Sequence, residues 1–177
     1  MRIIDLPDLA ATQAFGRWLG QRLWPGAVVA LIGPLGAGKT QLVRAIAEGL
    51  GLADSRIVTS PTFVLMQEYP ARLPIYHFDA YRLHREAEFA DLGVYEYFQG
   101  GGVCLIEWAD RVRGCLPAEH LCIMLETTGE TSRRALIEAK GEDYAKLIAA
   151  MGGIPRFFVE PRAVGERGRA RLRLAAK

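Results

Sequence analysis

Two short apolar runs predict strands that are buried on both faces. The first, Ala27 to Ile32, follows the turn-forming pair Pro25-Gly26 and is rich in β-branched residues. The second, Val103 to Ile106, is followed by Glu107. Continuous apolar runs of this length are typical of parallel strands that are covered by helices on both sides of a sheet. We therefore expect both runs to lie in the interior of a parallel sheet.

Apolar residues spaced three and four positions apart predict the helices. Asp8 is suited to cap the first of them, and Gly51 follows the end of the second as a stop signal. The expected helical segments are Leu9 to Leu23, Gln41 to Leu50, Arg85 to Leu92 and Tyr144 to Met151, with Gly93 to Gln99 helical or irregular.

Alternating apolar and polar residues predict the remaining strands. Two of them, His120 to Glu126 and Arg134 to Ala139, are joined by the polar turn Thr127 to Ser132, so we expect a hairpin that closes one side of the sheet. The other expected strands are Arg2 to Leu6, Phe63 to Tyr69 and a strand that begins at Ile75.

The chain of 177 residues is expected to form one domain, residues 1–151, followed by a basic tail, residues 152–177. Gly152-Gly153 marks the boundary. The tail carries seven Lys or Arg against two Glu, which leaves the remainder of the chain net acidic although the total charge is +2. Such a tail is expected to be flexible; it can contact RNA phosphates, but a solubilising role is the more common one.

Composition favours a globular cytoplasmic protein. Half of the residues are hydrophobic and 24% are charged. No apolar run reaches the roughly 18 residues of a membrane span, and the first residues lack the pattern of a signal peptide. The cysteines, Cys104, Cys115 and Cys122, have no C-x-x-C spacing, so we expect them to be reduced and mostly buried.

The segment from Gly33 to Thr40 matches the phosphate-loop pattern G-x-x-x-x-G-K-[ST] between a predicted strand and a predicted helix. Its glycines let the backbone amides and the positive helix end face an anion. Lys39 adds a charge near the outer phosphates, and the Thr40 hydroxyl can ligate Mg²⁺. The alternative is a glycine-rich turn that precedes a helix by chance.

Two acidic residues lie where strands are expected to end. Glu107 follows the second apolar run, and a carboxylate there is suited to the Mg²⁺ shell beside a phosphate loop. Asp79 follows the strand that begins at Ile75 and is suited to act on water or Mg²⁺. A salt bridge between Asp79 and Arg82 is the structural alternative. His77 shares a strand face with Asp79, but no third ligand has suitable spacing, which argues against a transition-metal site.

Three further features have two interpretations each. Ser60-Pro61-Thr62 could form a switch-like loop that reaches Mg²⁺, although a plain turn that starts a strand is favoured. Thr12 could reach a bound base, although a solvent-facing position is favoured. Trp108 could close one side of the site or belong to the core.

Four segments in this order resemble the bacterial TsaE (YjeE) family of small P-loop ATPases, which take part in making threonylcarbamoyladenosine on tRNA. They are Gly33 to Thr40, Ser60 to Phe63, the motif His77-x-Asp79-x-Tyr81-Arg82, and Leu105 to Trp108. Leu6-Pro7-Asp8 with Thr12 also fits the family. The similarity covers roughly residues 1–151, and the basic tail departs from the compact family pattern.

The resemblance implies an α/β, three-layer P-loop NTPase fold with a central, mainly parallel sheet and flanking antiparallel strands. It implies ATP and Mg²⁺ as cofactors, with Thr40 and Glu107 serving the metal and Asp79, Glu107 and Lys39 serving catalysis. Ser60 to Phe63 would be switch-like. The nucleotide would contact Thr12, Leu35, Gly36, Ala37, Gly38, Lys39, Thr40 and Trp108.

The family resemblance also implies TsaB and TsaD as partners, with tRNA contacted indirectly through them. A weak Mg-dependent ATPase would then reset TsaD, the transferase, for further turnover. A small-molecule or nucleoside kinase is the main rival, but the only dense arginine cluster lies in the tail. A GTPase is disfavoured because no Asn-Lys-x-Asp segment occurs. A nucleotide-gated binding module with negligible turnover is the non-enzymatic rival.

Overall fold

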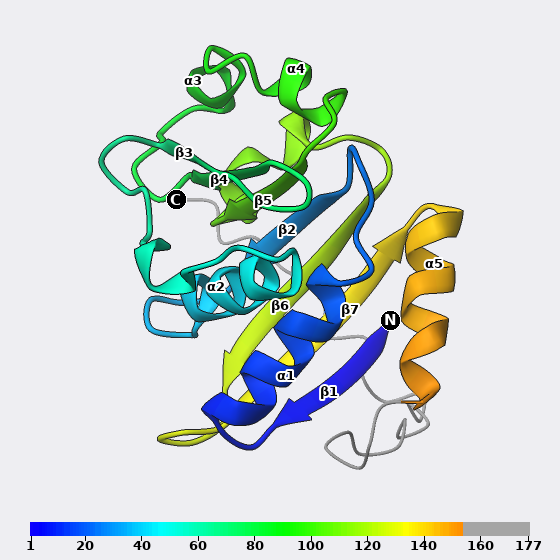
Figure 1. The fold of residues 1–177 in the computed structure, drawn as a ribbon. Helices are drawn as coiled ribbons and strands as arrows, with labels where there is room; N and C mark the ends of the chain where they lie inside the picture. Colours follow the sequence, from blue (N-terminus) through cyan, green and yellow to red (C-terminus); the bar gives the residue numbers. More distant parts are fainter. Residues whose placement is uncertain (154–177) are drawn as a thin grey trace.

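The computed structural model describes residues 1–153, which form a seven-stranded sheet in the order β1-β7-β6-β2-β5-β4-β3 (Figure 1). The central strands β6, β2, β5 and β4 are parallel, while β7, β1 and β3 pair antiparallel with their neighbours. The strands are β1 Arg2–Leu6, β2 Val28–Ile32, β3 Met66–Tyr69, β4 Ile75–Asp79, β5 Val103–Glu107, β6 His120–Thr127 and β7 Arg133–Lys140. The expected mainly parallel α/β sheet is confirmed.

Helices cover both faces of the sheet and create two apolar cores. They are α1 Leu9–Gly20, α2 Lys39–Gly49, α3 Glu86–Ala90, α4 Val94–Phe98 and α5 Glu142–Ala149, with 3₁₀ helices η1 Ser55–Ile57, η2 Ala109–Cys115 and η3 Ala150–Gly153. Val29 and Leu31 of β2 face the core that includes α1, α2 and α5. Val28 and Ala30 face the core that includes α3, α4 and η2. Two cores on one sheet explain why β2 and β5 are apolar at almost every position.

Helices α1 and α2 lie side by side across one face of the sheet (Figure 1). Asp8 caps α1 as expected, because its carboxylate accepts a hydrogen bond of 2.7 Å from the Ala11 amide. A Cβ added to Gly20 would overlap with the Ile46 carbonyl oxygen, and one added to Gly49 would overlap with the Arg17 carbonyl oxygen. The two helix backbones therefore touch at positions where only glycine fits.

Two sequence-based boundaries and one expected strand arrangement are wrong. The strand expected from Phe63 begins only at Met66, because a turn precedes it and Leu65 adopts a left-handed φ of 65° that a strand cannot contain. Helix α1 ends at Gly20 and not at Leu23, although Leu23 still packs into the core. The predicted hairpin β6–β7 forms, but it does not close the sheet, since β1 pairs with the outer side of β7.

All three cysteines are free thiols, with Cys104 and Cys115 buried and Cys122 half-buried. Burial raises the pKa of the Cys104 thiol to about 12. None of the helices in the described part of the chain has the length and apolar character to cross a bilayer. The proposed boundary at residue 151 stays a prediction, because the basic tail from residue 154 lies outside the described residues.

Candidate functional site

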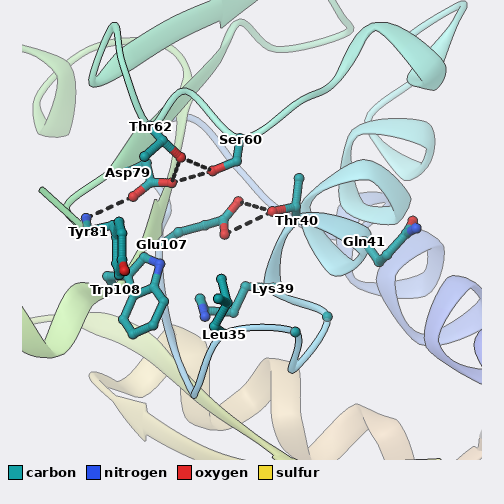
Figure 2. Close-up of a pocket in the computed structure, with 12 residues that line it drawn as sticks. Leu35, Lys39, Thr40, Gln41, Ser60, Thr62, Asp79, Tyr81, Glu107 and Trp108 are labelled. Atoms are coloured by element: carbon teal, nitrogen blue, oxygen red, sulfur yellow. Dashed lines mark hydrogen bonds between the residues drawn. The ribbon is translucent and has the colours of Figure 1, made fainter. Parts of the chain in front are cut away.

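The carboxyl ends of three neighbouring parallel strands meet at one cavity of about 460 Å³ (Figure 2). The loop that follows β2 lines it, together with Asp79 at the end of β4 and Glu107 at the end of β5, which are partners in the strand register. Ligands of open α/β sheets bind at this edge. The cavity is lined by Leu35, Gly36, Gly38, Lys39, Thr40, Gln41, Ser60, Thr62, Asp79, Tyr81, Glu107 and Trp108.

The Gly33 to Thr40 loop has the backbone of an anion-binding turn. Gly36 and Gly38 adopt φ values of 78° and 99°, which side chains with a Cβ rarely adopt. Helix α2 begins directly afterwards at Lys39, so its unpaired amides and positive dipole end lie at the cavity. This geometry suits a phosphate group.

The Lys39 side chain is folded back over its own loop and is only 5% exposed. Its Nζ donates to the carbonyl oxygens of Gly33 at 2.7 Å and Pro34 at 2.9 Å. The same atom lies 3.7 Å from the centroid of the Trp108 ring. Burial lowers the pKa of the Lys39 amine, and the nearby carboxylates, Glu107 above all, oppose that shift. A largely desolvated cation thus lies inside the cavity.

Glu107 connects the phosphate loop to β4. The Thr40 hydroxyl donates to its carboxylate, with Oγ1 2.8 Å from Oε1 and 3.0 Å from Oε2 (Figure 2). On the other side, Nε2 of the fully buried His77 lies 2.9 Å from Oε1. The Nδ1 atom of His77 has no hydrogen-bond partner in the described structure, so the ring is held by the hydrogen bond that Nε2 donates to the Glu107 carboxylate. His77 therefore orients Glu107.

The oxygen atoms of Thr40 and Glu107 are the hard ligands that Mg²⁺ prefers. Among residues 1–153, no group of three or more His, Cys, Asp or Glu side chains is placed to hold a metal ion. A Mg²⁺ ion here would consequently take its other ligands from water and from a bound phosphate, as this ion commonly does.

Asp79 is hydrogen-bonded to the loop that precedes β3. Its Oδ2 atom accepts hydrogen bonds from the hydroxyls of Ser60 and of Thr62, the latter at 3.0 Å, and its Oδ1 accepts the Tyr81 amide at 2.8 Å (Figure 2). The alternative salt bridge to Arg82 is wrong, because none of the ion pairs in residues 1–153 joins Arg82 to Asp79, and its guanidinium instead lies 4.1 Å from the Phe63 ring centroid. Ser60 and Thr62 thus line the cavity as a turn that touches the site.

Trp108 follows Glu107 in a left-handed conformation with a φ of 58°. Its ring lies between Lys39 and Tyr81, whose ring centroid is 4.9 Å away. The side chain is half-buried and lines the cavity, so it is not simply part of the core.

Thr12 lies on the other side of the phosphate loop, in a second cavity of about 510 Å³. It is 5% exposed and its hydroxyl donates to the Asp8 carbonyl at 3.2 Å, so the favoured solvent-facing interpretation is wrong. The two cavities share Gly38 and Gln41. The second is lined by Asp8, Leu9, Ala10, Thr12, Ala37, Gly38, Gln41, Leu125, Thr131 and Arg133.

Comparison with known proteins identifies the family of this chain. The family model "Threonylcarbamoyl adenosine biosynthesis protein TsaE" matches residues 6–135. The chain belongs to the TsaE family. Two relatives named "tRNA threonylcarbamoyladenosine biosynthesis protein TsaE" share 44% identity over 77% of this chain and 84% of the Bacillus subtilis protein, and 41% identity over 71% of this chain and 92% of the Treponema pallidum protein. The resemblance seen in the sequence is confirmed.

A solved structure agrees with the assignment to the TsaE family. The crystal structure of YdiB from Bacillus subtilis superposes with a TM-score of 0.73 at 36% identity, over 84% of this chain and 92% of that chain. The expected P-loop NTPase fold is therefore shown by both the sheet topology and the structural neighbour.

One contact at the site of this TsaE family member was not expected from the sequence. Arg133, the first residue of β7, donates hydrogen bonds to carbonyls of the phosphate loop 96 residues earlier in the chain. No local pattern signals such a contact, because an arginine at the start of a strand is ordinarily a solvent-facing residue.

Proposed function

We propose that this protein binds ATP with Mg²⁺ and hydrolyses it slowly, as a component of the machinery that makes threonylcarbamoyladenosine on tRNA. The observation that carries the proposal is the Thr40–Glu107 pair, which places a hydroxyl and a carboxylate together at the start of the phosphate-loop helix. The names of the TsaE relatives support the link to tRNA modification.

Residues of both cavities would bind the nucleotide, the phosphates in one cavity and the base in the other. Lys39 exchanges the Gly33 and Pro34 carbonyls for the outer phosphates, which is favourable because a buried cation gains a full anionic partner. Thr40 and Glu107 would hold Mg²⁺, and the ion would supply positive charge next to the phosphates. By family resemblance Thr12 lies near the adenine, and its position in the second cavity agrees with a base on that side of the loop.

Asp79 is the group suited to act on water. Hydrolysis requires a water oxygen to bond to the γ-phosphorus while the bond to the bridging oxygen of ADP breaks. The Asp79 carboxylate lines the cavity of about 460 Å³ that contains Lys39 and Glu107, called here the phosphate-side cavity. It lies next to Glu107 in the sheet and can accept a hydrogen bond from that water. Its bonds to Ser60 and Thr62 hold it in place, so the Ser60 to Phe63 loop has a direct effect on the hydrolytic group.

Reconstitution tests this function. The protein is mixed with TsaB, TsaD, ATP, threonylcarbamoyl-adenylate and tRNA, and modified adenosine is measured per TsaD. With the wild-type protein we expect several modifications per TsaD, and with Glu107→Ala no more than about one, because the Mg²⁺ ligand is lost. Glu142→Ala is the control, since that side chain is 82% exposed and lies on α5, away from both cavities.

Two outcomes would contradict the proposal in different ways. Phosphate that appears on a small metabolite, and not free in solution, would identify a kinase. Normal multiple turnover by Glu107→Ala would show that the assembly does not depend on hydrolysis at this site.

Trp108 provides a direct readout of nucleotide binding. Because its ring contacts Lys39 at the cavity, ADP with Mg²⁺ is expected to change the intrinsic tryptophan fluorescence. The change should disappear in Trp108→Phe and persist in Trp24→Phe, whose ring packs on Tyr144 at 4.8 Å. If ADP with Mg²⁺ still changed the fluorescence of Trp108→Phe as it does that of wild type, the nucleotide would bind elsewhere.

A further inference from the structure

Arg133 is anchored by the sheet on both sides. It is the first residue of β7, and its backbone is in register with Leu6 of β1 and with Thr127 of β6. An arginine whose main chain is fixed in this way needs to order only its side chain to make a contact.

The guanidinium of Arg133 joins the phosphate loop to the β6–β7 turn. Nε donates to the Ala37 carbonyl at 3.1 Å, and Nη2 donates to the Gly36 carbonyl at 3.2 Å. Nη1 donates to the carbonyls of Ser132 at 2.8 Å and of Gly129 at 3.2 Å. The planar fork of arginine, with its fixed donor directions, is suited to bridge two backbone segments in this way.

These contacts hold backbone carbonyls of the phosphate loop. In a trans peptide the N–H and C=O groups point in opposite directions, so holding the carbonyls of Gly36 and Ala37 also fixes the direction of the following amides. Of these, the Ala37 amide also donates to the Pro34 carbonyl at 3.2 Å inside the loop. Gly36 and Gly38 have positive φ values, and without an external contact such a backbone is the least restricted part of a loop.

The charge of Arg133 is also available to the site. Within residues 1–153, none of the ion pairs to a carboxylate involves Arg133, whereas the adjacent Arg134 is paired with Asp5 at 2.7 Å. Because Arg133 has carbonyl partners and, among the described residues, no carboxylate partner, its positive charge is not neutralised and adds positive potential at the phosphate position. Arg133 also lines the cavity that contains Thr12.

We propose that Arg133 is a positioning residue for nucleotide phosphates, which acts by holding the phosphate-loop carbonyls from the sheet. The inference rests on the proposed nucleotide-binding function and adds a residue and a mode of action to it. The β6–β7 turn thereby becomes part of the binding site, because its carbonyls hold the other end of the same guanidinium.

Two substitutions and a matched neighbour test the proposal. Arg133→Met is expected to weaken ADP binding, measured by calorimetry, about tenfold, since two charge-assisted hydrogen bonds to the loop are lost. Arg133→Lys keeps the positive charge but lacks the planar guanidinium donors, and its affinity for ADP is expected to fall about threefold. Arg134→Met removes the neighbouring arginine, which pairs with Asp5, and should change the affinity less than twofold.

Hydrogen exchange supplies a readout that does not require nucleotide. In the ligand-free protein, amide exchange over residues 34–40 should be at least about tenfold faster in Arg133→Met than in wild type, with the strands of the sheet unchanged. A general loss of stability would instead accelerate exchange in the sheet as well, and would overturn a local positioning role.

The outcomes separate the two proposals. If wild type fails to bind ADP, the proposed function is wrong, and exchange in the ligand-free loop still decides whether Arg133 holds it. If wild type binds ADP and Arg133→Met binds it within twofold, only the role of Arg133 is wrong. Should Arg133→Met unfold, Arg133→Lys decides the question, and an affinity for ADP equal to that of wild type would overturn the role.

Discussion

Lys39→Ala is expected to reduce ATP hydrolysis at least about 100-fold and to abolish multiple rounds of tRNA modification. The amine of Lys39 is buried at the cavity, where a positive charge interacts with phosphate far more strongly than it would in water. Removing one group that stabilises transition-state charge in such a site commonly costs a factor of 10² to 10³. Phosphate release from ATP by the purified protein, with and without TsaB and TsaD, measures the effect.

Lys146→Ala is the matched control for that measurement. Lys146 is 66% exposed and pairs with Glu142 on α5, so its loss should leave hydrolysis unchanged. Circular dichroism of Lys39→Ala would check that the fold survives the loss of the two carbonyl contacts. Near-normal turnover by a folded Lys39→Ala variant would contradict the ATP-driven account.

Gly20→Ala is expected to lower the free energy of unfolding by about 3 kcal/mol. A methyl group at Gly20 would overlap with the Ile46 carbonyl oxygen and lie 3.0 Å from the Gly49 Cα atom. Backbone atoms cannot rotate away, so α1 and α2 would have to separate. The gain in helix propensity, roughly 0.5 to 1 kcal/mol, is too small to compensate.

Urea unfolding followed by circular dichroism measures this difference, with Gly101→Ala as the control. A methyl group at Gly101 would meet no atom within 4 Å, so its effect should stay within about 0.5 kcal/mol. Equal unfolding midpoints for the two variants would show that the helices can separate at little cost.

The parts of the site that the sequence predicted are those set by consecutive residues. The phosphate loop is recognisable because strand, glycines, lysine and helix follow one another directly, from Val28 to Gly49. Glu107 and Asp79 could be assigned to the same edge because each comes at the end of a predicted strand. The helix cap at Asp8 is likewise a local interaction.

The parts that the sequence could not predict depend on contacts between distant segments. The burial of Thr12 results from packing of α1 beside the phosphate loop, which its own helical pattern does not encode. The bond between His77 and Glu107 depends on β4 and β5 being neighbours in the sheet. The strand expected from Phe63 begins later because the apolar pattern does not show that Leu65 lies in a turn with a positive φ.

The glycine contacts between α1 and α2 have a consequence for ligand selection. The start of α2 borders the phosphate-side cavity, and the start of α1, with Asp8 and Thr12, borders the other. Since the two backbones touch at Gly20 and Gly49, the helices cannot slide or part without losing that contact. The relative placement of the two adjoining cavities is therefore fixed by the fold, and a ligand that fills both must have a shape that fits this placement.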